Sequence, residues 1–315
     1  MKTQNENFAT AIGALAALAT FVEIAISPKP GLVDSCGAGA HKDMDWALFM
    51  ASASALASYW EEQALEGMRC AESGARDALL AKLRSRGVDM ESAMFLATGG
   101  VNTHKGAIFA LSIMVGATGI CLSEGDCSPD NIFSKSSEII SPTMANEFAN
   151  MKQKALARDE ASLTNGEKIF LRYGVGGIRK EAMDGFPSVR NGLAEYETAL
   201  ANGARGNDAA LSALLHIMSV CEDTNVIHRA GFDFWRGEYM ERVEATKKRF
   251  DSAKPDYSSL LELDEFLIEK NASPGGAADL LACTLFLYRS KIPDINNASQ
   301  KLGQWRSHDE SWKET

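Results

Sequence analysis

Residues 27–34 (SPKPGLVD) and 41–45 (HKDMD) are the first place along the chain where residue types suited to chemistry gather. Two prolines stiffen the loop around Lys29 and restrict how its ammonium group is presented. Asp43 and Asp45 follow, and a carboxylate pair of this kind can ligate Mg²⁺ through oxygen. The alternative interpretation is that both carboxylates cap the next helix and interact with its dipole.

Residues 99–106 (GGVNTHKG) lead directly into an apolar segment with helical periodicity. Backbone N–H groups at the start of a helix bind anions, and Lys105 lies beside them, so the segment is a candidate phosphate cradle. It is not a Walker motif, because no glycine precedes Lys105 and Gly106 stands where Ser or Thr would bind the metal. His104 is either a hydrogen-bond donor to a substrate or a structural cap.

Residues 174–187 (GVGGIRKEAMDGFP) combine glycines with a cation and two carboxylates. Arg179 offers a planar fork that matches phosphate oxygens. Glu181 and Asp184 are three residues apart and share one face if the segment is helical. The alternative is a solvent-exposed turn with internal salt bridges.

Residues 222–225 (EDTN) and 273–279 (SPGGAAD) complete the set. Asp223 and Asn225 are residue types that bind metals or hydroxyl groups, and they follow an apolar helical segment. Asp279 lies one turn inside another apolar segment, where a carboxylate needs a partner. The alternative is that these side chains cap other parts of the chain.

The elements that must position these residues are predicted to be helices, since no alternation of β-branched residues is long enough for a strand. With 45% hydrophobic and 23% charged residues, the 315-residue chain is long enough to bury a sizeable core. We predict an all-α fold: one large multi-helix domain over residues 1–300, a polar tail over 301–315, and an active site formed by loops and helix N-termini. Helices are expected at about 5–26, 44–65, 67–86, 89–97, 104–122, 129–158, 164–173, 189–202, 207–221, 238–253, 257–270 and 275–289.

The composition excludes several classes of function. The formal net charge is −10, which argues against nucleic-acid binding, so anionic substrates would need a local group of cations. Six cysteines without CxxC spacing indicate reduced thiols in a cytoplasmic protein. The alanine-rich residues 8–26 could pass for a signal peptide, but Glu6 precedes them and Glu23 lies within them, which favours a buried first helix. No membrane span is predicted elsewhere.

The segments SPKPGLVD, GAHKDMD, ATGGVNTHKG, GGIRKEAMDGFPSV, EDTNV and NASPGGAADLL occur in this order between residue 27 and about residue 287. In this combination the chain resembles the triphosphoribosyl-dephospho-CoA synthase family, also called ATP:dephospho-CoA triphosphoribosyltransferases. The resemblance implies a cytoplasmic, all-helical enzyme that moves the 5-triphosphoribosyl group of ATP to the 2′-hydroxyl of 3′-dephospho-CoA and releases adenine. It also implies that the product becomes the prosthetic group of the acyl carrier protein of citrate lyase or malonate decarboxylase.

This chemistry sets expectations for the motif residues. An α-linked product from β-linked ATP implies a single inverting displacement, for which a carboxylate is a suitable general base. The expected catalytic residues are Glu181 first, Asp184 second, and His104 as a hydrogen-bonding group. The expected substrate and phosphate ligands are Lys29, Lys42, Asn102, Thr103, Lys105, Arg179, Asn225, Ser273, Gly275 and Gly276. The expected ligands of Mg²⁺, which a triphosphate requires, are Asp43, Asp45, Asp223 and Asp279.

Three alternatives remain at this point. A phosphotransferase would use the same Lys, Gly and Asp groups but would yield ADP. A glycohydrolase acting on ADP-ribose-like substrates would use water as its nucleophile and need no dephospho-CoA. A helical binding protein would use the glycine-rich segments only as turns. The expected partners are ATP and dephospho-CoA, with no nucleic acid and no membrane, and a homodimer is left open.

Overall fold

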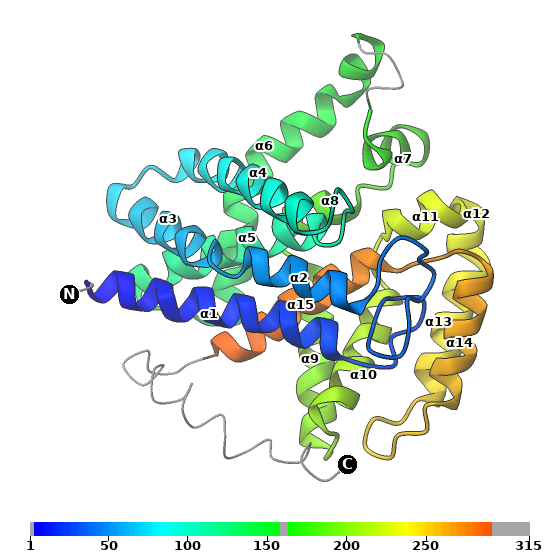
Figure 1. Cartoon of the computed structure of the whole chain (residues 1–315). Helices are drawn as coiled ribbons and strands as arrows, with labels where there is room; N and C mark the ends of the chain where they lie inside the picture. Colours follow the sequence, from blue (N-terminus) through cyan, green and yellow to red (C-terminus); the bar gives the residue numbers. More distant parts are fainter. Residues whose placement is uncertain (1–2, 158–162, 292–315) are drawn as a thin grey trace.

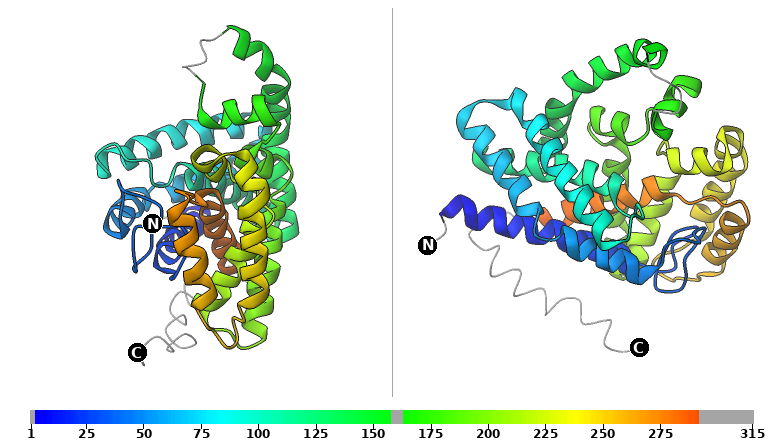
Figure 2. Two further views of the ribbon diagram at one scale, coloured as in Figure 1. Left: turned by 90° about the vertical axis from the view of Figure 1, so that its right-hand side faces the viewer. Right: turned by 45° about the horizontal axis from the view of Figure 1, so that its top comes forward.

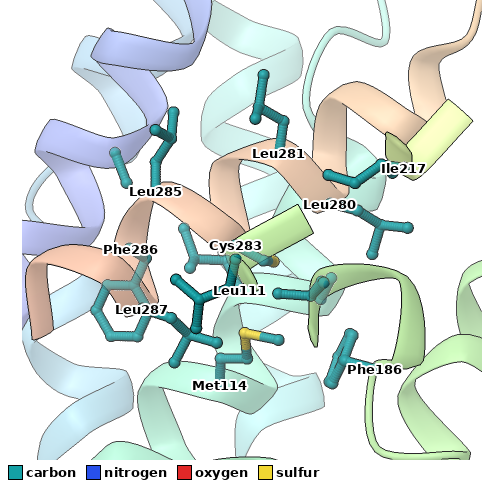
Figure 3. Close-up of a cluster of buried hydrophobic side chains, with 14 of the residues drawn as sticks. Leu111, Met114, Phe186, Ile217, Leu280, Leu281, Cys283, Leu285, Phe286 and Leu287 are labelled. Carbon is teal, nitrogen blue, oxygen red and sulfur yellow. The ribbon is translucent and has the colours of Figure 1, made fainter. Parts of the chain in front are cut away.

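Two long apolar helices, α5 (Lys105–Glu124) and α15 (Gly275–Ser290), lie at the centre of the molecule in the computed structural model, which describes residues 3–157 and 163–291. They pack against each other, and α15 also packs against α10 (Gly206–Met218); Figure 3 shows Leu111 and Met114 of α5, and Leu280 of α15 beside Ile217 of α10. Both helices begin at motif segments. The central core therefore fixes where residues 102–106 and 273–279 lie.

The other helices surround this pair (Figure 1). They are α1 (Gln4–Ala25), α2 (Trp46–Leu56), α3 (Trp60–Ser73), α4 (Leu79–Ala97), α6 (Pro129–Ala157), α7 (Asn165–Tyr173), α8 (Gly177–Met183), α9 (Pro187–Ala201), α11 (Thr224–Ala230), α12 (Phe232–Phe234), α13 (Met240–Arg249) and α14 (Ser258–Glu269). The described residues contain no strand, so the predicted all-α class is confirmed. The predicted polar tail, residues 301–315, lies outside the described residues, as does the end of the predicted domain beyond residue 291.

Some predicted helix boundaries are wrong. The expected helix over 44–65 is two helices, α2 and α3, separated by a turn at residues 57–59. Between the expected helices at 164–173 and 189–202 the structure has a further short helix, α8, whose seven residues are too few to give a periodic signal. Glu181 lies in α8, whereas Asp184 is the residue at which that helix ends.

Among the described residues, α1 and α5 are the two helices that are long and apolar enough to cross a membrane by length and composition. In α5, 78% of the most apolar window is buried inside the structure, and in α1 the share is 56%. Glycines let α3 approach α5 closely: a Cβ atom on Gly67 would lie 2.0 Å from the carbonyl oxygen of Gly116. Both apolar helices are therefore packed as parts of the core.

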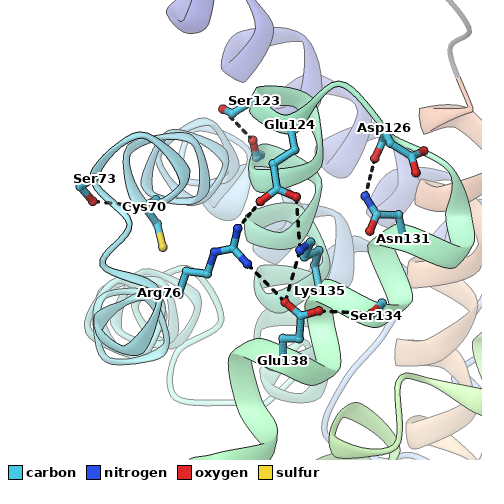
Figure 4. Close-up of polar contacts among 11 residues, drawn as sticks. Cys70, Ser73, Arg76, Ser123, Glu124, Asp126, Asn131, Ser134, Lys135 and Glu138 are labelled. Atoms are coloured by element: carbon cyan, nitrogen blue, oxygen red, sulfur yellow. Dashed lines mark hydrogen bonds and ion pairs between the residues drawn. The ribbon is translucent and has the colours of Figure 1, made fainter.

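Helix α6 starts beside the end of α5 and leads away from the core. Its base is linked to α5 and to the turn before α4 by Arg76, Glu124, Lys135 and Glu138, which form the ion-pair network of Figure 4. Its far end lies next to α7 in both views of Figure 2. The end of α6 and α7 together form one wall of the cavity described below.

A small apolar cluster, separate from the main core, ties α7 to α11. Its buried members are Ile169, Val175 and Ile227. Beside it Tyr173 stacks on Phe232 with ring centroids 4.4 Å apart. The cluster holds α7 against the part of the chain that carries Asp223 and Asn225, so it sets the width of the cavity between them.

Candidate active site

A cavity of about 1090 Å³ lies where the four motif segments meet. It is bounded by the loop after α1, by the N-terminal ends of α5, α8, α11 and α15, and by α4, α6 and α7. The predicted site residues that line it are Lys29, Asp43, Asn102, Thr103, His104, Lys105, Arg179, Glu181, Asp223, Asn225, Ser273, Gly275, Gly276 and Asp279. The sequence segments that carry chemistry are thus brought together although they lie far apart along the chain.

Three predicted site residues do not line the cavity. Lys42 is exposed on the loop after α1. Asp45 caps α2, because its Oδ1 accepts the backbone N–H of Leu48 at 2.8 Å. Asp184 is exposed and pairs with Lys180 one turn earlier. The structure therefore agrees with the alternative interpretations, helix capping for Asp45 and a local salt bridge for Asp184.

Asp223 joins two helix N-termini in the cavity floor. Its Oδ1 accepts the backbone N–H of Asn225 at 2.9 Å and caps α11, and its Oδ2 accepts the N–H of Ala277 in the first turn of α15 at 3.0 Å. The side chain is 1% exposed, and burial raises its pKa to about 6 although the N–H groups act to lower it. Gly276 permits this contact, since a Cβ atom there would lie 3.0 Å from Oδ2.

Asp279 projects from α15 toward the first turn of α5. A Cβ atom on Gly106 would lie 1.9 Å from its Oδ2, so a larger residue there would displace this carboxylate, and the backbone of Ala107 donates a hydrogen bond to it. Burial raises the pKa of Asp279 well above its ordinary value, and the negative charges of Asp223 and Glu23 raise it further. Its carboxylate forms part of the cavity wall, and the N–H of Ala107 is the hydrogen-bond donor that it meets among the described residues.

Glu181 is held by the start of the next long helix. Its two carboxylate oxygens accept the N–H of Ser188 at 2.6 Å and the Ser188 hydroxyl at 3.0 Å. Burial raises the pKa of Glu181, and the Ser188 and Val189 N–H groups counteract that effect. Both oxygens therefore serve as a remote cap of α9, which leaves less of this carboxylate to accept a proton from a substrate.

Lys29 is buried and paired with Glu23, a carboxylate outside the motif segments. Its Nζ lies 2.5 Å from Oε1 of Glu23 and 2.9 Å from the Glu23 carbonyl oxygen, and both side chains are under 10% exposed. Asp34 shapes the loop around it by accepting the N–H groups of Lys29 and Cys36, both at 2.7 Å. The ammonium of Lys29 is thus fixed on the cavity wall and already neutralised.

The cations of the cavity differ in how far they are neutralised. Lys105 pairs with Glu91 at 2.7 Å, and Arg84 pairs with Glu147 at 2.7 Å. Arg179, on α8, has no hydrogen-bond or ion-pair partner among the described residues. Arg179 is therefore the guanidinium that is free to bind an anion without first releasing a carboxylate.

The start of α5 is less open to phosphate than the sequence suggests. Oδ1 of Asn102 accepts the N–H of Lys105 at 3.2 Å, and the N–H of Ala107 is bonded to Asp279. A carboxylate at a helix N-terminus is favoured by the same dipole that would attract phosphate. The predicted cradle is thus partly filled by the protein itself.

His104 is buried between α2 and α5. Its Nδ1 lies 2.7 Å from Oγ of Ser52 and 3.2 Å from Oγ1 of Thr103, while its Nε2 has no partner among the described residues. Burial lowers the pKa of His104 to about 3, and the charge of Lys29 lowers it further. The imidazole is therefore neutral near pH 7.

Comparison with known proteins adds the family. The chain matches the model of the CitG family, described as ATP:dephospho-CoA triphosphoribosyl transferase, over residues 9–297. The chain belongs to this family. A probable 2-(5''-triphosphoribosyl)-3'-dephosphocoenzyme-A synthase from Azotobacter vinelandii is 40% identical over 90% of this chain and 91% of its own length. The synthase from Pectobacterium atrosepticum is 36% identical over 85% of each chain, and no solved structure matches.

Two residues at this site, Glu23 and Ser52, were not predicted from the sequence. Glu23 carries a signal, since a carboxylate inside an apolar helix needs a cation, but the sequence does not say which one. Ser52 carries none, because a serine in a helix is common. Among residues 3–157 and 163–291 no group of three or more His, Cys, Asp or Glu side chains could hold a metal ion by itself.

The buried Glu23–Lys29 ion pair predicts that the stability of the protein depends strongly on keeping both charges together. Glu23→Gln leaves the Lys29 ammonium buried without a counter-charge, which should lower the free energy of unfolding by about 3–5 kcal/mol in urea titration. The double variant Glu23→Gln/Lys29→Met should recover most of that loss, because no buried charge remains. Equal destabilisation of the single and double variants would contradict the pairing.

Proposed function

We propose that the cavity binds ATP and 3′-dephospho-CoA side by side and transfers the 5-triphosphoribosyl group between them. The C1′–N9 bond of ATP breaks, a bond forms from C1′ to the 2′-oxygen of dephospho-CoA, the hydroxyl proton passes to an enzyme carboxylate, and adenine leaves with the electron pair and takes up a proton. The observation that carries the proposal is Asp279, a carboxylate on the wall of a large cavity with a raised pKa and little hydrogen bonding. A base of this kind is what an attacking hydroxyl needs.

The choice of Asp279 over Glu181 rests on the donors around each. Glu181 is bound by an N–H and a hydroxyl that act on both of its oxygens, and N–H donors stabilise the charged form of a carboxylate. Asp279 meets the charges of Asp223 and Glu23 instead. Neighbouring negative charge makes a carboxylate a stronger proton acceptor.

The triphosphate is assigned to the side of the cavity where Arg179 and Lys105 lie. Arg179 is free to bind phosphate oxygens at once, and Lys105 can exchange Glu91 for phosphate. Asn225, Ser273 and the first N–H groups of α15 line the same cavity and offer neutral donors. Anions are favoured at the N-terminus of a helix of this length.

The wall formed by α4, α6 and α7 suits the uncharged arm of dephospho-CoA. It presents Val88, Phe148, Met151 and Phe170, with the rings of Phe148 and Phe170 4.5 Å apart. The pantetheine arm is a flexible chain of methylenes and amides without charge. Apolar and aromatic side chains are the usual lining for such a ligand, and on this wall they lie beside the Arg84–Glu147 ion pair.

Magnesium fits the site as an ion that arrives with the triphosphate. Mg²⁺ is typically held by substrate phosphates, waters and one or two carboxylates, and no cage built by the described residues is needed. Asp43 lines the cavity with an exposed carboxylate and would supply one oxygen. Such an ion would neutralise the phosphates and orient them.

We place the product as the precursor of the prosthetic group of an acyl carrier protein, that of citrate lyase or malonate decarboxylase, and the enzyme in the cytoplasm. Support comes from the family and from the six cysteines, all free thiols. Whether the chain forms a homodimer stays a prediction.

The identity of the leaving group tests the function. Purified protein with ATP, Mg²⁺ and 3′-dephospho-CoA should release adenine, detected by chromatography, and the release should depend on dephospho-CoA. ADP as the product would place the protein among phosphotransferases. Adenine released equally well without dephospho-CoA would indicate a glycohydrolase.

Asp279→Asn should lower kcat by about 10²–10⁴-fold, the usual contribution of a general base. The same change should raise stability at pH 7. The pKa of this carboxyl is higher in the folded protein than its ordinary value of 3.8, so the protein becomes less stable as pH rises from 3.8 to the folded-state pKa. Asn does not titrate, so the variant escapes this loss. Thermal unfolding should therefore favour the variant at pH 7 and show little difference below about pH 4. A variant with nearly full kcat, or one less stable than wild type at pH 7, would contradict this role.

Arg179→Ala should raise KM for ATP by about 10-fold or more, the usual effect of losing one charge-assisted hydrogen bond to phosphate. KM for dephospho-CoA should change less. Arg249→Ala is the matched control, since Arg249 lies on the surface with Glu262 and away from the cavity. Equal effects of the two substitutions on KM for ATP would refute the assignment of Arg179.

A further inference from the structure

Ser52, Thr103 and His104 form a closed hydrogen-bonding triangle at the cavity wall. Oγ1 of Thr103 donates to Oγ of Ser52 at 2.7 Å, and Oγ of Ser52 lies 2.7 Å from Nδ1 of His104. Ser52 is fully buried in α2, and no other hydrogen bond to its hydroxyl is found among the described residues. The protons in this triangle can therefore be counted.

The count selects one tautomer of the imidazole. If Nδ1 accepts, the Thr103 hydroxyl donates to Ser52 and the Ser52 hydroxyl donates to Nδ1, so both hydroxyl protons are used and only the Nε2 proton lacks an acceptor. If Nδ1 carried the proton, one of the two hydroxyl protons would have no acceptor in the triangle and Nε2 would be a buried acceptor without a donor. An unmade buried hydrogen bond is costly, so the first arrangement is favoured.

In that tautomer Nε2 carries the proton, and it has no acceptor. Nε2 is buried and has no partner among the described residues, and His104 is one of the residues that line the cavity. Phe49 packs edge-on against the ring at 5.0 Å between centroids and limits its rotation. The donor is thus preformed, and the acceptor that completes it comes with a ligand.

We propose that Ser52 is a positioning residue, which holds His104 as a neutral Nε2–H donor to an acceptor atom of the bound ATP. The inference rests on the proposed function and adds a residue that touches no substrate. A neutral donor suits a purine ring nitrogen, on which negative charge grows as the C1′–N9 bond breaks, and it equally suits a phosphate oxygen. Either contact would strengthen in the transition state without a proton transfer.

The tautomer can be read directly, whether or not the enzyme is active. In protein labelled with ¹⁵N-histidine, we expect His104 to show a protonated Nε2 and an unprotonated Nδ1 from pH 5.5 to 8.5. Ser52→Ala should give a mixture of tautomers at the same pH. A wild-type protein with Nδ1 protonated, or a His104 that titrates in this range, would overturn the proposal.

Kinetics separate positioning from packing. Ser52→Ala should lower kcat about 10-fold with KM for dephospho-CoA unchanged, and Ser52→Thr, which keeps the hydroxyl, should recover part of the loss. Ser136→Ala is the matched control: Ser136 is also fully buried in a helix, but it bonds a backbone carbonyl of α6 and does not line the cavity. Equal losses in Ser52→Ala and Ser136→Ala would leave Ser52 a packing residue and overturn the proposal.

Substitution of the ring itself distinguishes a neutral donor from an acid or base. His104→Gln places an amide N–H near the position of Nε2, so it should retain about 10-fold more kcat than His104→Ala, which should lose about 10²–10³-fold. Equal loss in both would contradict the donor role.

With 7-deaza-ATP and 3-deaza-ATP, a smaller effect of His104→Ala on one analogue identifies a ring nitrogen as the acceptor, and an unchanged effect identifies phosphate. Failure of the wild type to release adenine would refute the function, and the ¹⁵N spectra would still decide the tautomer.

Discussion

The cavity floor depends on one constraint: carboxylates that are buried without enough cations must be satisfied by helix N-termini. Asp223 meets N–H groups of α11 and α15, Glu181 meets those of α9, and Asp279 meets that of Ala107 in α5. In a fold without strands among the described residues, helix N-termini offer N–H groups that have no partner within the helix and can point into a cavity. The positions of four helices are therefore coupled to the charges that the chemistry requires.

The number of N–H groups that bind each carboxylate distinguishes the roles of these three residues. The carboxylate oxygens of Asp223 and Glu181 accept hydrogen bonds from helix N-termini and hold those helices in place, which fixes the shape of the cavity floor. Asp279 receives less from the backbone and lies near other negative charge, so it keeps the capacity to take a proton. Three acidic side chains that look equivalent in the sequence thus differ because each meets a different set of N–H groups.

The sequence predicted the helical class and the segments that meet at the cavity, because glycine, lysine and carboxylate groups mark the ends of apolar helices. It did not predict the partner of each atom. Lys29 and Lys42 are equally plausible phosphate ligands in the sequence, but one is buried against Glu23 and the other is exposed. Gly106 looked like part of a phosphate loop, whereas its missing Cβ makes room for the carboxylate of Asp279. Contacts between segments far apart along the chain decide these roles, and spacing along the chain does not record them.

The distribution of charge explains why this cavity suits glycosyl transfer better than phosphoryl transfer. Moving a γ-phosphate requires cations and metal concentrated at the terminal phosphate, with little demand on a base. Here Lys29 is already neutralised and His104 is uncharged, and both lie on the cavity wall with the carboxylate of Asp279. A displacement at C1′ needs a base for the incoming hydroxyl and a donor that does not protonate the leaving group prematurely. In our proposal the neutral imidazole of His104 and the carboxylate of Asp279 serve these two functions, while the guanidinium of Arg179 holds the phosphates, which do not react.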